Sequence, residues 1–322
     1  MKLLAVLVAL AACVAILALW KARAHEARAE AAFPPEGQFV AVDGNRVHAV
    51  VMGPRDGSVP DLVLIHGASG NTRDMTFDLA PRLARDYRVI VLDRPGLGYT
   101  ARINRSGATI TEQAELLQRA AAELGAERPI VLGHSYGGAV ALAWAVTRPD
   151  HIAALVMVAG AAKPWDTGLS VYYRVLSHPM LGPLVIPLLT AFVRDERVEQ
   201  AVGEIFAPQE PPKGYLEHIG AGLTLRRHSL RANALQRANL LGEIEALHGR
   251  YDEIKVPTEI VHGNADTTVG LAIHSEPLAA QVTGANLTVL EGVGHMPHHS
   301  APQAVIAAIH RAATRAGLRR AD

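Results

Sequence analysis

The chain has 322 residues, a formal net charge of +0 and a hydrophobic share of 49%. That length suits one large α/β domain with an insertion, or two small domains, and the apolar content excludes global disorder. The balanced charge gives no sign of a nucleic acid or an acidic polymer as partner. Cys13 is the one cysteine of the chain, so an intrachain disulfide is impossible and the compartment is left open.

The N-terminal segment, residues 1–23, contains an unbroken apolar run from Leu3 to Trp20. Its length is close to the minimum for a helix that spans a membrane, so we expect a single N-terminal anchor. Two alternatives stay open: a signal peptide cleaved after Ala24, which would release a secreted or periplasmic protein, and a lipoprotein processed at Cys13. The basic residues after the run favour a cytoplasmic domain, but the sequence leaves the side of the membrane open.

Residues 24–37 are rich in Ala, Glu and Pro and are expected to form a linker. Alternating apolar runs on both sides of Asp43-Gly44 are typical of a β-hairpin. Short apolar runs then predict buried strands at residues 61–67 (ending in a glycine turn), 88–92, 129–132, 152–158, 257–263 and 286–290. Helical patterns lie between them at residues 71–87, 109–124 (with Thr111 as a possible N-cap), 139–146, 271–282 and 302–316.

Short strands that alternate with helices predict a mostly parallel sheet covered on both faces, with its binding site at the carboxyl ends of the strands. The alternation stops between residues 163 and 252, which contain helical stretches, prolines and aromatic residues but no clear strand. We therefore expect a core built from residues 38–162 and 253–318, with residues 163–252 inserted as a helical cap.

The motif Gly133-His134-Ser135-Tyr136-Gly137-Gly138 stands between an apolar strand and a long apolar helix. In that setting Gly-x-Ser-x-Gly is typical of a nucleophile elbow, a tight turn that exposes the serine hydroxyl at a helix N-terminus. A serine nucleophile needs a base within hydrogen-bond reach and a group that orients the base. Asp266 and His295 follow the last two predicted strands and are the candidates for these positions.

The chain resembles serine hydrolases of the α/β-hydrolase superfamily, from about Phe39 to Leu318. Five motifs in chain order carry the resemblance: His66-Gly67-Ala68-Ser69-Gly70, Asp93-Arg94-Pro95-Gly96-Leu97-Gly98, the elbow, Gly263-Asn264-Ala265-Asp266 and Gly292-Val293-Gly294-His295. The resemblance implies an eight-stranded, mostly parallel sheet with a cap. It also implies Ser135 as nucleophile, His295 as general base and Asp266 as its orienting carboxylate. The backbone N–H groups of Tyr136 and Ala68 would form the oxyanion hole.

Other candidate residues receive structural interpretations. His298 and His299 lie near His295 but do not follow the Gly-x-Gly turn, and Asp93 is expected to hold its loop. His134 is expected to pack under the elbow, and His66 to hydrogen-bond within the oxyanion loop. Arg226, Arg227 and Arg231 are expected on a solvated face, and the apolar stretch from Met180 to Val193 is expected to be a cap helix that lines an apolar pocket. The spacing of the 15 histidines suggests no metal site.

These observations predict an enzyme that cleaves a carboxylic ester of a partly apolar small molecule through an acyl-enzyme, without a metal or an organic cofactor. Epoxide hydrolases and haloalkane dehalogenases of this fold carry aspartate where this chain has Ser135. Carbon–carbon bond hydrolysis, acyl transfer and perhydrolysis stay open as alternatives, because they differ in pocket shape rather than in triad. A non-catalytic binding protein is the alternative of another class, and the oligomeric state is open.

Overall fold

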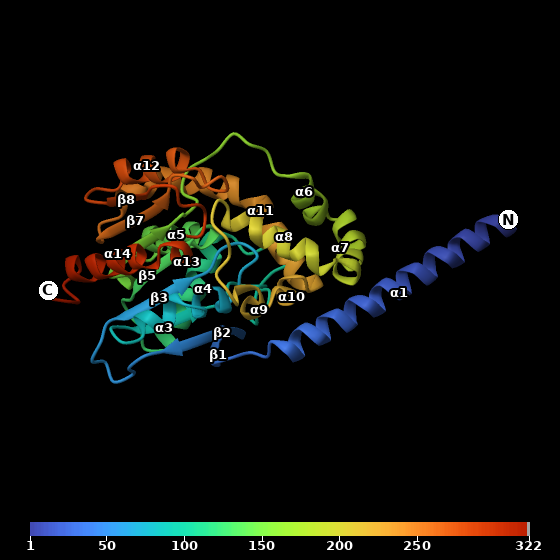
Figure 1. Ribbon diagram of the computed structural model, residues 1–322, viewed down its shortest axis with the longest axis horizontal. Helices are drawn as coiled ribbons and strands as arrows, with labels where there is room; N and C mark the ends of the chain where they lie inside the picture. Colours follow the sequence, from blue (N-terminus) through green and yellow to red (C-terminus); the bar gives the residue numbers. More distant parts are fainter. Residues whose placement is uncertain (321–322) are drawn as a thin grey trace.

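The computed structural model describes residues 1–320, which form an eight-stranded sheet flanked by helices (Figure 1). The strands are β1 (Gln38–Val42), β2 (Asn45–Met52), β3 (Asp61–Ile65), β4 (Arg88–Leu92), β5 (Ile130–His134), β6 (Ala154–Val158), β7 (Thr258–Gly263) and β8 (Asn286–Leu290). Their order is β1-β2-β4-β3-β5-β6-β7-β8, in which β2 is antiparallel to both of its neighbours and every other pair is parallel. The eight-stranded, mostly parallel sheet expected from the sequence is confirmed.

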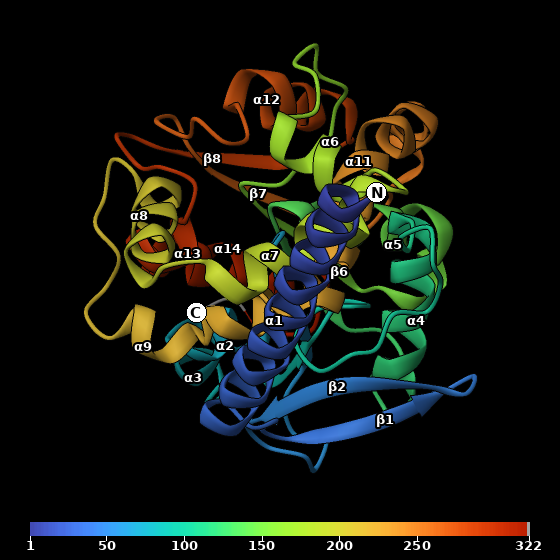
Figure 2. The same ribbon diagram turned by 90° about the vertical axis from the view of Figure 1, so that its right-hand side faces the viewer.

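The side chains of the central strands alternate between two buried layers. In β3, Val63 and Ile65 point into one layer and Leu62 and Leu64 into the other. The first layer is covered by α4 (Ile110–Glu123), α5 (Tyr136–Thr147) and α12 (Leu271–Gln281), and the second by α2 (Thr72–Thr76), α3 (Leu79–Leu83) and α14 (Pro302–Arg315). Figure 2 shows α4 and α5 on one side of the sheet and α3 and α14 on the other. Because both faces are covered, these strands consist of continuous apolar residues, as the sequence shows.

Two local expectations need correction. The segment 71–87 forms two short helices, α2 and α3, rather than one. The N-cap of α4 is Thr109, not Thr111: its hydroxyl accepts from the Glu112 amide while the Glu112 carboxylate accepts from the Thr109 amide. This reciprocal capping box satisfies two otherwise unpaired donors, which an N-cap at Thr111 could not do with the same glutamate.

The chain between β6 and β7 is helical. It contains α6 (Val171–Ser177), α7 (Leu181–Phe192), α8 (Asp195–Phe206), α9 (Tyr215–Ile219), α10 (Ala221–Thr224), α11 (Arg227–Leu247) and the 3-10 turn η2 (His248–Glu253). The shorter elements η1 (Pro149–His151) and α13 (Pro297–Ser300) lie outside this insertion. The helices α6 to α10 gather beyond one end of the sheet, and α11 runs back from them toward α5 (Figure 1).

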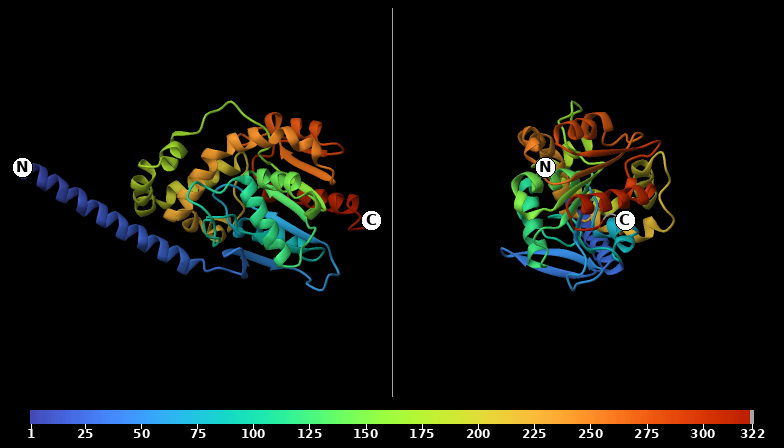
Figure 3. Two further views of the ribbon diagram at one scale, coloured as in Figure 1. Left: turned by 180° about the vertical axis from the view of Figure 1, so that it is seen from behind. Right: turned by 90° about the vertical axis from the view of Figure 1, so that its left-hand side faces the viewer.

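The N-terminal helix α1 runs without a break from Lys2 to Ala32, so residues 24–32 are helical rather than an irregular linker. Alanine and glutamate are strong helix formers, and the first proline, Pro34, comes only after the helix has ended. The second half of α1 packs on the cap, where Ala18, Ala22 and Ala29 are buried. The first half projects away from the rest of the molecule (Figure 3).

The three arginines expected on a solvated face are engaged instead. Arg226 is buried, pairs with Glu30 and donates to the carbonyl of Gly98. Arg227 pairs with Glu26, and Arg231 donates to backbone carbonyls of the α6–α7 turn. The expectation failed because the carboxylates lie about two hundred residues away in the sequence, on a segment interpreted as a linker.

We expect Gly137→Ala to destabilise the fold by about 1–3 kcal/mol or more, because an added Cβ would overlap the Ile65 carbonyl oxygen and lie 2.6 Å from that of His66. Gly242→Ala is the matched control. It lies in α11 with no atom near its added Cβ, and it should be neutral or stabilising by up to about 1 kcal/mol. Urea unfolding of both variants measures the difference. Equal stability of the two would show that the elbow does not need this close approach.

Candidate active site

Ser135 stands at the turn from β5 into α5, in a backbone conformation that is unusual for a residue with a side chain. Its φ is +54°, and such a conformation persists only where the surroundings hold it. The Ser135 amide donates to the Val158 carbonyl at 3.0 Å, and the Ser135 carbonyl accepts from Gly138 and Ala161 at 3.0 and 3.1 Å. These bonds fix the turn on β6 and on the first turn of α5, so the hydroxyl is held at the carboxyl end of the sheet.

The structure brings the three residues of the expected triad together. Ser135 Oγ lies 2.9 Å from His295 Nε2, and His295 Nδ1 lies 2.7 Å from Asp266 Oδ2. They follow the carboxyl ends of three parallel strands, β5, β7 and β8, of which β7 and β8 are neighbours and β6 separates β5 from β7. A carboxylate can only accept, so His295 carries its proton on Nδ1 and presents a free lone pair on Nε2 to the serine hydroxyl. All three side chains are buried, with Ser135 only 9% exposed.

Asp266 is surrounded by hydrogen-bond donors. Its Oδ1 accepts from the amides of Thr268 and Val269 at 2.8 and 2.9 Å, and its Oδ2 lies 3.1 Å from His262 Nε2. Burial would raise the pKa of this carboxyl, but hydrogen bonds from His262 and His295 hold it below its ordinary value. The group is therefore an anion at neutral pH, which keeps the tautomer of His295 fixed.

His262 has a part in the site that the sequence did not reveal. Its Nε2 lies 2.7 Å from the Val269 carbonyl as well as near Asp266, and its Nδ1 lies 2.6 Å from the Ser275 hydroxyl. The carbonyl can only accept, so His262 carries a proton on Nε2, and the Ser275 hydroxyl holds the other side of the ring. His262 thus orients the carboxylate that orients His295. Its place at the end of β7, directly before the Gly263-Asn264-Ala265-Asp266 motif, was the available signal.

The loop after β3 is held by the cap. Ser69 has φ +57°, its amide donates to Asn233 Oδ1 at 2.9 Å, and its carbonyl accepts from the Thr224 hydroxyl at 2.7 Å. Asn233 Nδ2 also donates to the Ser69 hydroxyl at 2.9 Å. The Ser69 amide is therefore occupied. Among residues 1–320 the Ala68 amide has no such acceptor, and the Tyr136 amide opens α5, where an intrahelical partner is impossible.

Arg94 fastens the same loop from below and was not singled out by the sequence. Its guanidinium donates to the carbonyls of His66 and Gly67 at 3.1 and 3.0 Å, and lies 4.1 Å from the centre of the Tyr136 ring. The Gly67 carbonyl and the Ala68 amide belong to one planar peptide and point in opposite directions, so holding the carbonyl also fixes the direction of this amide. Burial lowers the pKa of Arg94 to about 10, which leaves it charged at neutral pH. Gln113 Oε1 and Gln236 Oε1 both accept from Arg94 Nη1 at 3.0 Å.

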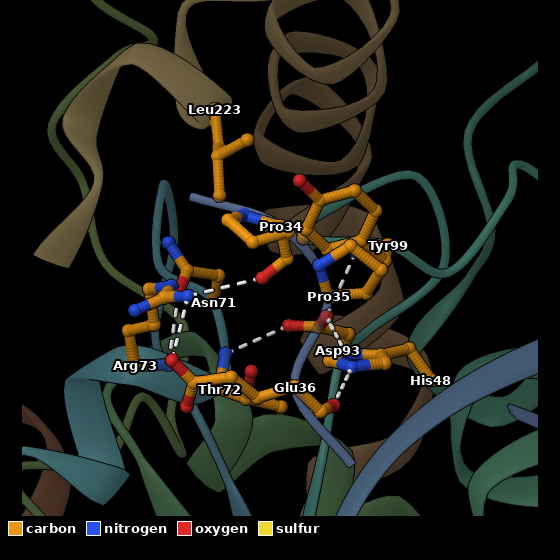
Figure 4. Close-up of a pocket in the computed structure, with 11 residues that line it drawn as sticks. Pro34, Pro35, Glu36, His48, Asn71, Thr72, Arg73, Asp93, Tyr99 and Leu223 are labelled. Atoms are coloured by element: carbon orange, nitrogen blue, oxygen red, sulfur yellow. Dashed lines mark hydrogen bonds and ion pairs between the residues drawn. The ribbon is translucent and has the colours of Figure 1, made fainter. Parts of the chain in front are cut away.

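Asp93 has the structural part that the sequence predicts. It accepts from the amides of Thr72 and Tyr99 at 2.7 and 2.8 Å and from His48 Nδ1 at 2.6 Å. A small hollow beside it is lined by residues of the segment that follows α1 (Figure 4). Its polar groups pair with one another, and Ser135, Asp266 and His295 do not line it. The contacts around the hollow hold the segment after α1 against the core, and the hollow is separate from the triad.

His298 and His299 face Asp74 rather than Ser135. Their Nε2 atoms lie 3.3 and 2.9 Å from its carboxylate, which also accepts from the Tyr215 hydroxyl at 2.8 Å. Burial would raise the pKa of Asp74, but the two imidazoles hold it well below its usual range. Burial lowers the pKa of His298 to about 4. Asp74 thereby ties the loop that carries His295 to α9 of the cap.

Asp74, His298 and His299 also have the spacing of a metal site, with ligand atoms within 4.8 Å of one another. A search of histidine spacing could not find this group, because Asp74 lies more than two hundred residues before the histidines. In the structure the imidazoles donate directly to the carboxylate, so a cation would have to displace both hydrogen bonds.

His134 and His66 are placed as the sequence suggests. His134 lies under the elbow, donates from Nε2 to the His295 carbonyl at 3.0 Å, and has its ring centre 4.3 Å from that of His298. His66 donates from Nδ1 to Gly67 O at 2.9 Å and accepts from the Arg94 amide at 3.0 Å. The His134 ring thus supports the elbow turn, and the His66 ring supports the turn after β3.

Comparison with known proteins gives a consistent result. A family model for the alpha/beta hydrolase family matches residues 62–308. A pimeloyl-[acyl-carrier protein] methyl ester esterase of Neisseria meningitidis is 30% identical over 266 residues, which cover 81% of this chain and 97% of that protein. A 2-hydroxy-6-oxononadienedioate/2-hydroxy-6-oxononatrienedioate hydrolase of Klebsiella pneumoniae is 27% identical over 273 residues, with 80% and 88% covered. The crystal structure of a membrane phospholipase A aligns over 100% of both chains, with a TM-score of 0.63 and 23% identity.

We expect Asp74→Asn to lower the free energy of unfolding at pH 7 by about 1.5–3 kcal/mol, the value of hydrogen bonds to a buried charged acceptor. Because the folded-state pKa of Asp74 is depressed, its contribution is present above about pH 4, the pKa of an unfolded aspartate, and is lost as the pH falls further. The difference between variant and wild type should therefore shrink in acid. Denaturant unfolding across the pH range measures it, with the exposed Asp150→Asn as control. Equal loss in both variants would contradict a special contribution of Asp74.

Proposed function

The chain belongs to the α/β hydrolase family, and from this premise we propose that it is a serine hydrolase that cleaves a carboxylic ester through an acyl-enzyme. The observation that carries the proposal is the continuous hydrogen-bond path from Ser135 through His295 to Asp266. The three side chains supply the hydrogen-bond roles that the reaction needs. The hydroxyl donates, the imidazole accepts, and the carboxylate is an anion.

In the proposed reaction Ser135 Oγ attacks the ester carbonyl as His295 Nε2 takes its proton. The oxygen of the tetrahedral intermediate binds the amides of Tyr136 and Ala68, the two donors that are free of other acceptors. His295 returns the proton to the leaving alcohol, and a water molecule activated by the same imidazole then releases the acid from Ser135. Asp266 stabilises the imidazolium in both steps without accepting its proton.

Ester hydrolysis is supported by the esterase relative, which is 30% identical and covers most of this chain. Carbon–carbon bond hydrolysis is a second candidate, supported by the oxononadienedioate hydrolase relative at 27% identity. The two chemistries can use the same serine and histidine, so the substrate decides between them.

We also propose that α1 is an uncleaved membrane anchor. It is the one helix in residues 1–320 that is long and apolar enough by itself to cross a bilayer, with a mean hydropathy of 2.9. A cleaved signal sequence would be equally apolar, but the packing favours retention. Ala18 and Ala22 are buried on the cap, and cleavage after Ala24 would strip this cover from α7. The fold likeness to the membrane phospholipase extends over the whole chain, α1 included.

For wild type we expect turnover of p-nitrophenyl esters in a series from acetate to palmitate, and a fall of about 10⁴-fold or more in kcat for Ser135→Ala. The exposed Ser106→Ala should keep full activity and serves as the matched control. A fluorophosphonate probe should label wild type and the control but not Ser135→Ala. A wild-type chain that the probe never labels would overturn the serine-hydrolase proposal. Labelling without ester turnover would instead favour the carbon–carbon hydrolase.

We expect Asn233→Ala to lower kcat by about 10- to 100-fold with a smaller change in KM, because the loop that carries the Ala68 amide loses its clamp on Ser69. Asn239→Ala is the control on the same helix, where the side chain donates to the Ser106 carbonyl at the surface. Steady-state kinetics with a short soluble ester measures the split between kcat and KM. An unchanged kcat would show that Asn233 does not position the oxyanion loop.

A further inference from the structure

An exposed apolar surface lies on α6, α7 and the turn between them. It consists of seven large side chains that are 42–74% exposed: Val171, Tyr172, Met180, Leu181, Leu184, Leu188 and Phe192. We call it the apolar cap surface. On α7 the exposed residues recur every three or four positions and so share one face of the helix. The opposite face, with Ile186 and Thr190, is buried against the cap, so α7 is apolar on its outer as well as its inner side.

This surface lies directly beside the part of α1 that leaves the molecule. The Lys21 ammonium lies 4.6 Å from the centre of the Phe192 ring, and Ala18 and Ala22 are buried where α1 meets α7. Before residue 18, α1 exposes large apolar side chains on all sides. Figure 1 shows α7 next to the point where the free half of α1 begins, and Figure 2 shows α1 crossing in front of α7 when viewed from that end.

The length of α1 determines how close the cap lies to the membrane that α1 enters. Its 31 residues extend about 46 Å, whereas the apolar part of a bilayer is about 30 Å thick. The apolar residues up to Trp20 fill that thickness, and the remainder of the helix must lie outside it. That remainder is packed on α7 and α10 and is held by the Glu26–Arg227 and Glu30–Arg226 ion pairs. An anchor fixed in this way brings α7 to the surface of the membrane.

The apolar helices themselves fit a position in the plane of the membrane. Together α6 and α7 are as apolar as a membrane span, but they are bent by 112° and α7 contains Pro187. A bent pair of short helices does not cross a bilayer as one rod, and an apolar face beside cationic groups binds at the boundary of headgroups and acyl chains. Lys21 and Arg194 directly follow the apolar parts of α1 and α7 and are placed to meet lipid phosphates.

We propose that α6 and α7 dock at the boundary of headgroups and acyl chains of the same bilayer that α1 enters. The enzyme would then take its ester from the lipid phase. The substrate would then be an amphiphilic ester with a long acyl chain rather than a freely soluble one. The inference rests on the proposed function for its substrate and on the proposed anchor for its orientation. It assigns a second membrane contact to the cap, beyond residues 3–20.

Fluorescence quenching tests the docking in full-length protein. Three variants on a Cys13→Ala background each carry one cysteine, in place of Leu184 on the apolar cap surface, Leu10 on α1 or Val289 on β8. Each cysteine is labelled with nitrobenzoxadiazole, and the protein is placed in phosphatidylcholine/phosphatidylglycerol vesicles. Val289 serves as the control because it is 46% exposed, belongs to the edge strand β8 and is distant from α7 in the sequence. We expect doxyl-labelled lipids to quench the labels at 184 and 10 but not the label at 289.

Quenching at 10 without quenching at 184 overturns the docking and leaves the anchor in place. A blue-shifted label at 184 that doxyl lipids do not quench also overturns it, because the cover would then be protein, such as a second copy of the chain. These outcomes do not depend on catalysis. If docking is seen but no ester is turned over, the proposed function fails while the membrane contact stands.

Kinetics tests the consequence for the substrate. In the double variant Leu184→Ser/Leu188→Ser, hydrolysis of a long-chain ester in vesicles should fall by about fivefold or more, because two apolar side chains no longer enter the lipid. Hydrolysis of p-nitrophenyl butyrate in solution should stay within about twofold, because neither leucine touches Ser135 or its partners. The control, Ile273→Ser/Val289→Ser, removes two exposed apolar side chains from the surface of α12 and β8, each 46% exposed against 69% and 42% for Leu184 and Leu188. An equal loss in both double variants, or an equal loss on both substrates, overturns the proposal.

Discussion

The tight turn at Ser135 is the constraint on which the rest of the site depends. A serine held at φ +54° is stable only because its amide and carbonyl are bonded to neighbouring backbone, and because Gly137 allows α5 to approach the carbonyls at the end of β3. That close approach sets the distance between the elbow and the oxyanion loop. A Cβ at Gly137 would push them apart, so the geometry of the two free amides follows from a packing contact rather than from their own bonds.

The hydrogen-bond partners of the buried charged side chains determine whether each of them stays ionised. Asp266 has two backbone donors and two imidazoles around it, which keeps it an anion where burial alone would favour a proton. Arg94 has no carboxylate on its guanidinium and is satisfied by two backbone carbonyls and two side-chain amides. A buried cation bound to neutral acceptors keeps its positive charge close to the loop whose amides are expected to receive an oxyanion.

The sequence predicts the placement of a side chain where that placement follows from a local pattern. The elbow and the strand ends of Asp266 and His295 are local patterns, and the parallel sheet brings such ends together without further information. The partners of Arg94, Asn233 and Asp74 come from distant segments, so a single sequence carries no sign of them. The same reason explains Arg226 and Arg227, which were expected on a solvated face but pair with Glu30 and Glu26 of α1.

One helix of the cap connects the separate parts of the molecule. The start of α11 is pinned to α1 through Arg227, its middle holds Ser69 through Asn233 and Arg94 through Gln236, and its last turns pack into the core with Leu240 and Ile244. It also packs on α6 and α7 through Leu230 and Ala234. A displacement of α11 would therefore also move the side chains that hold Ser69 and Arg94. The contacts of α11 therefore link the position of the cap to that of the loop after β3.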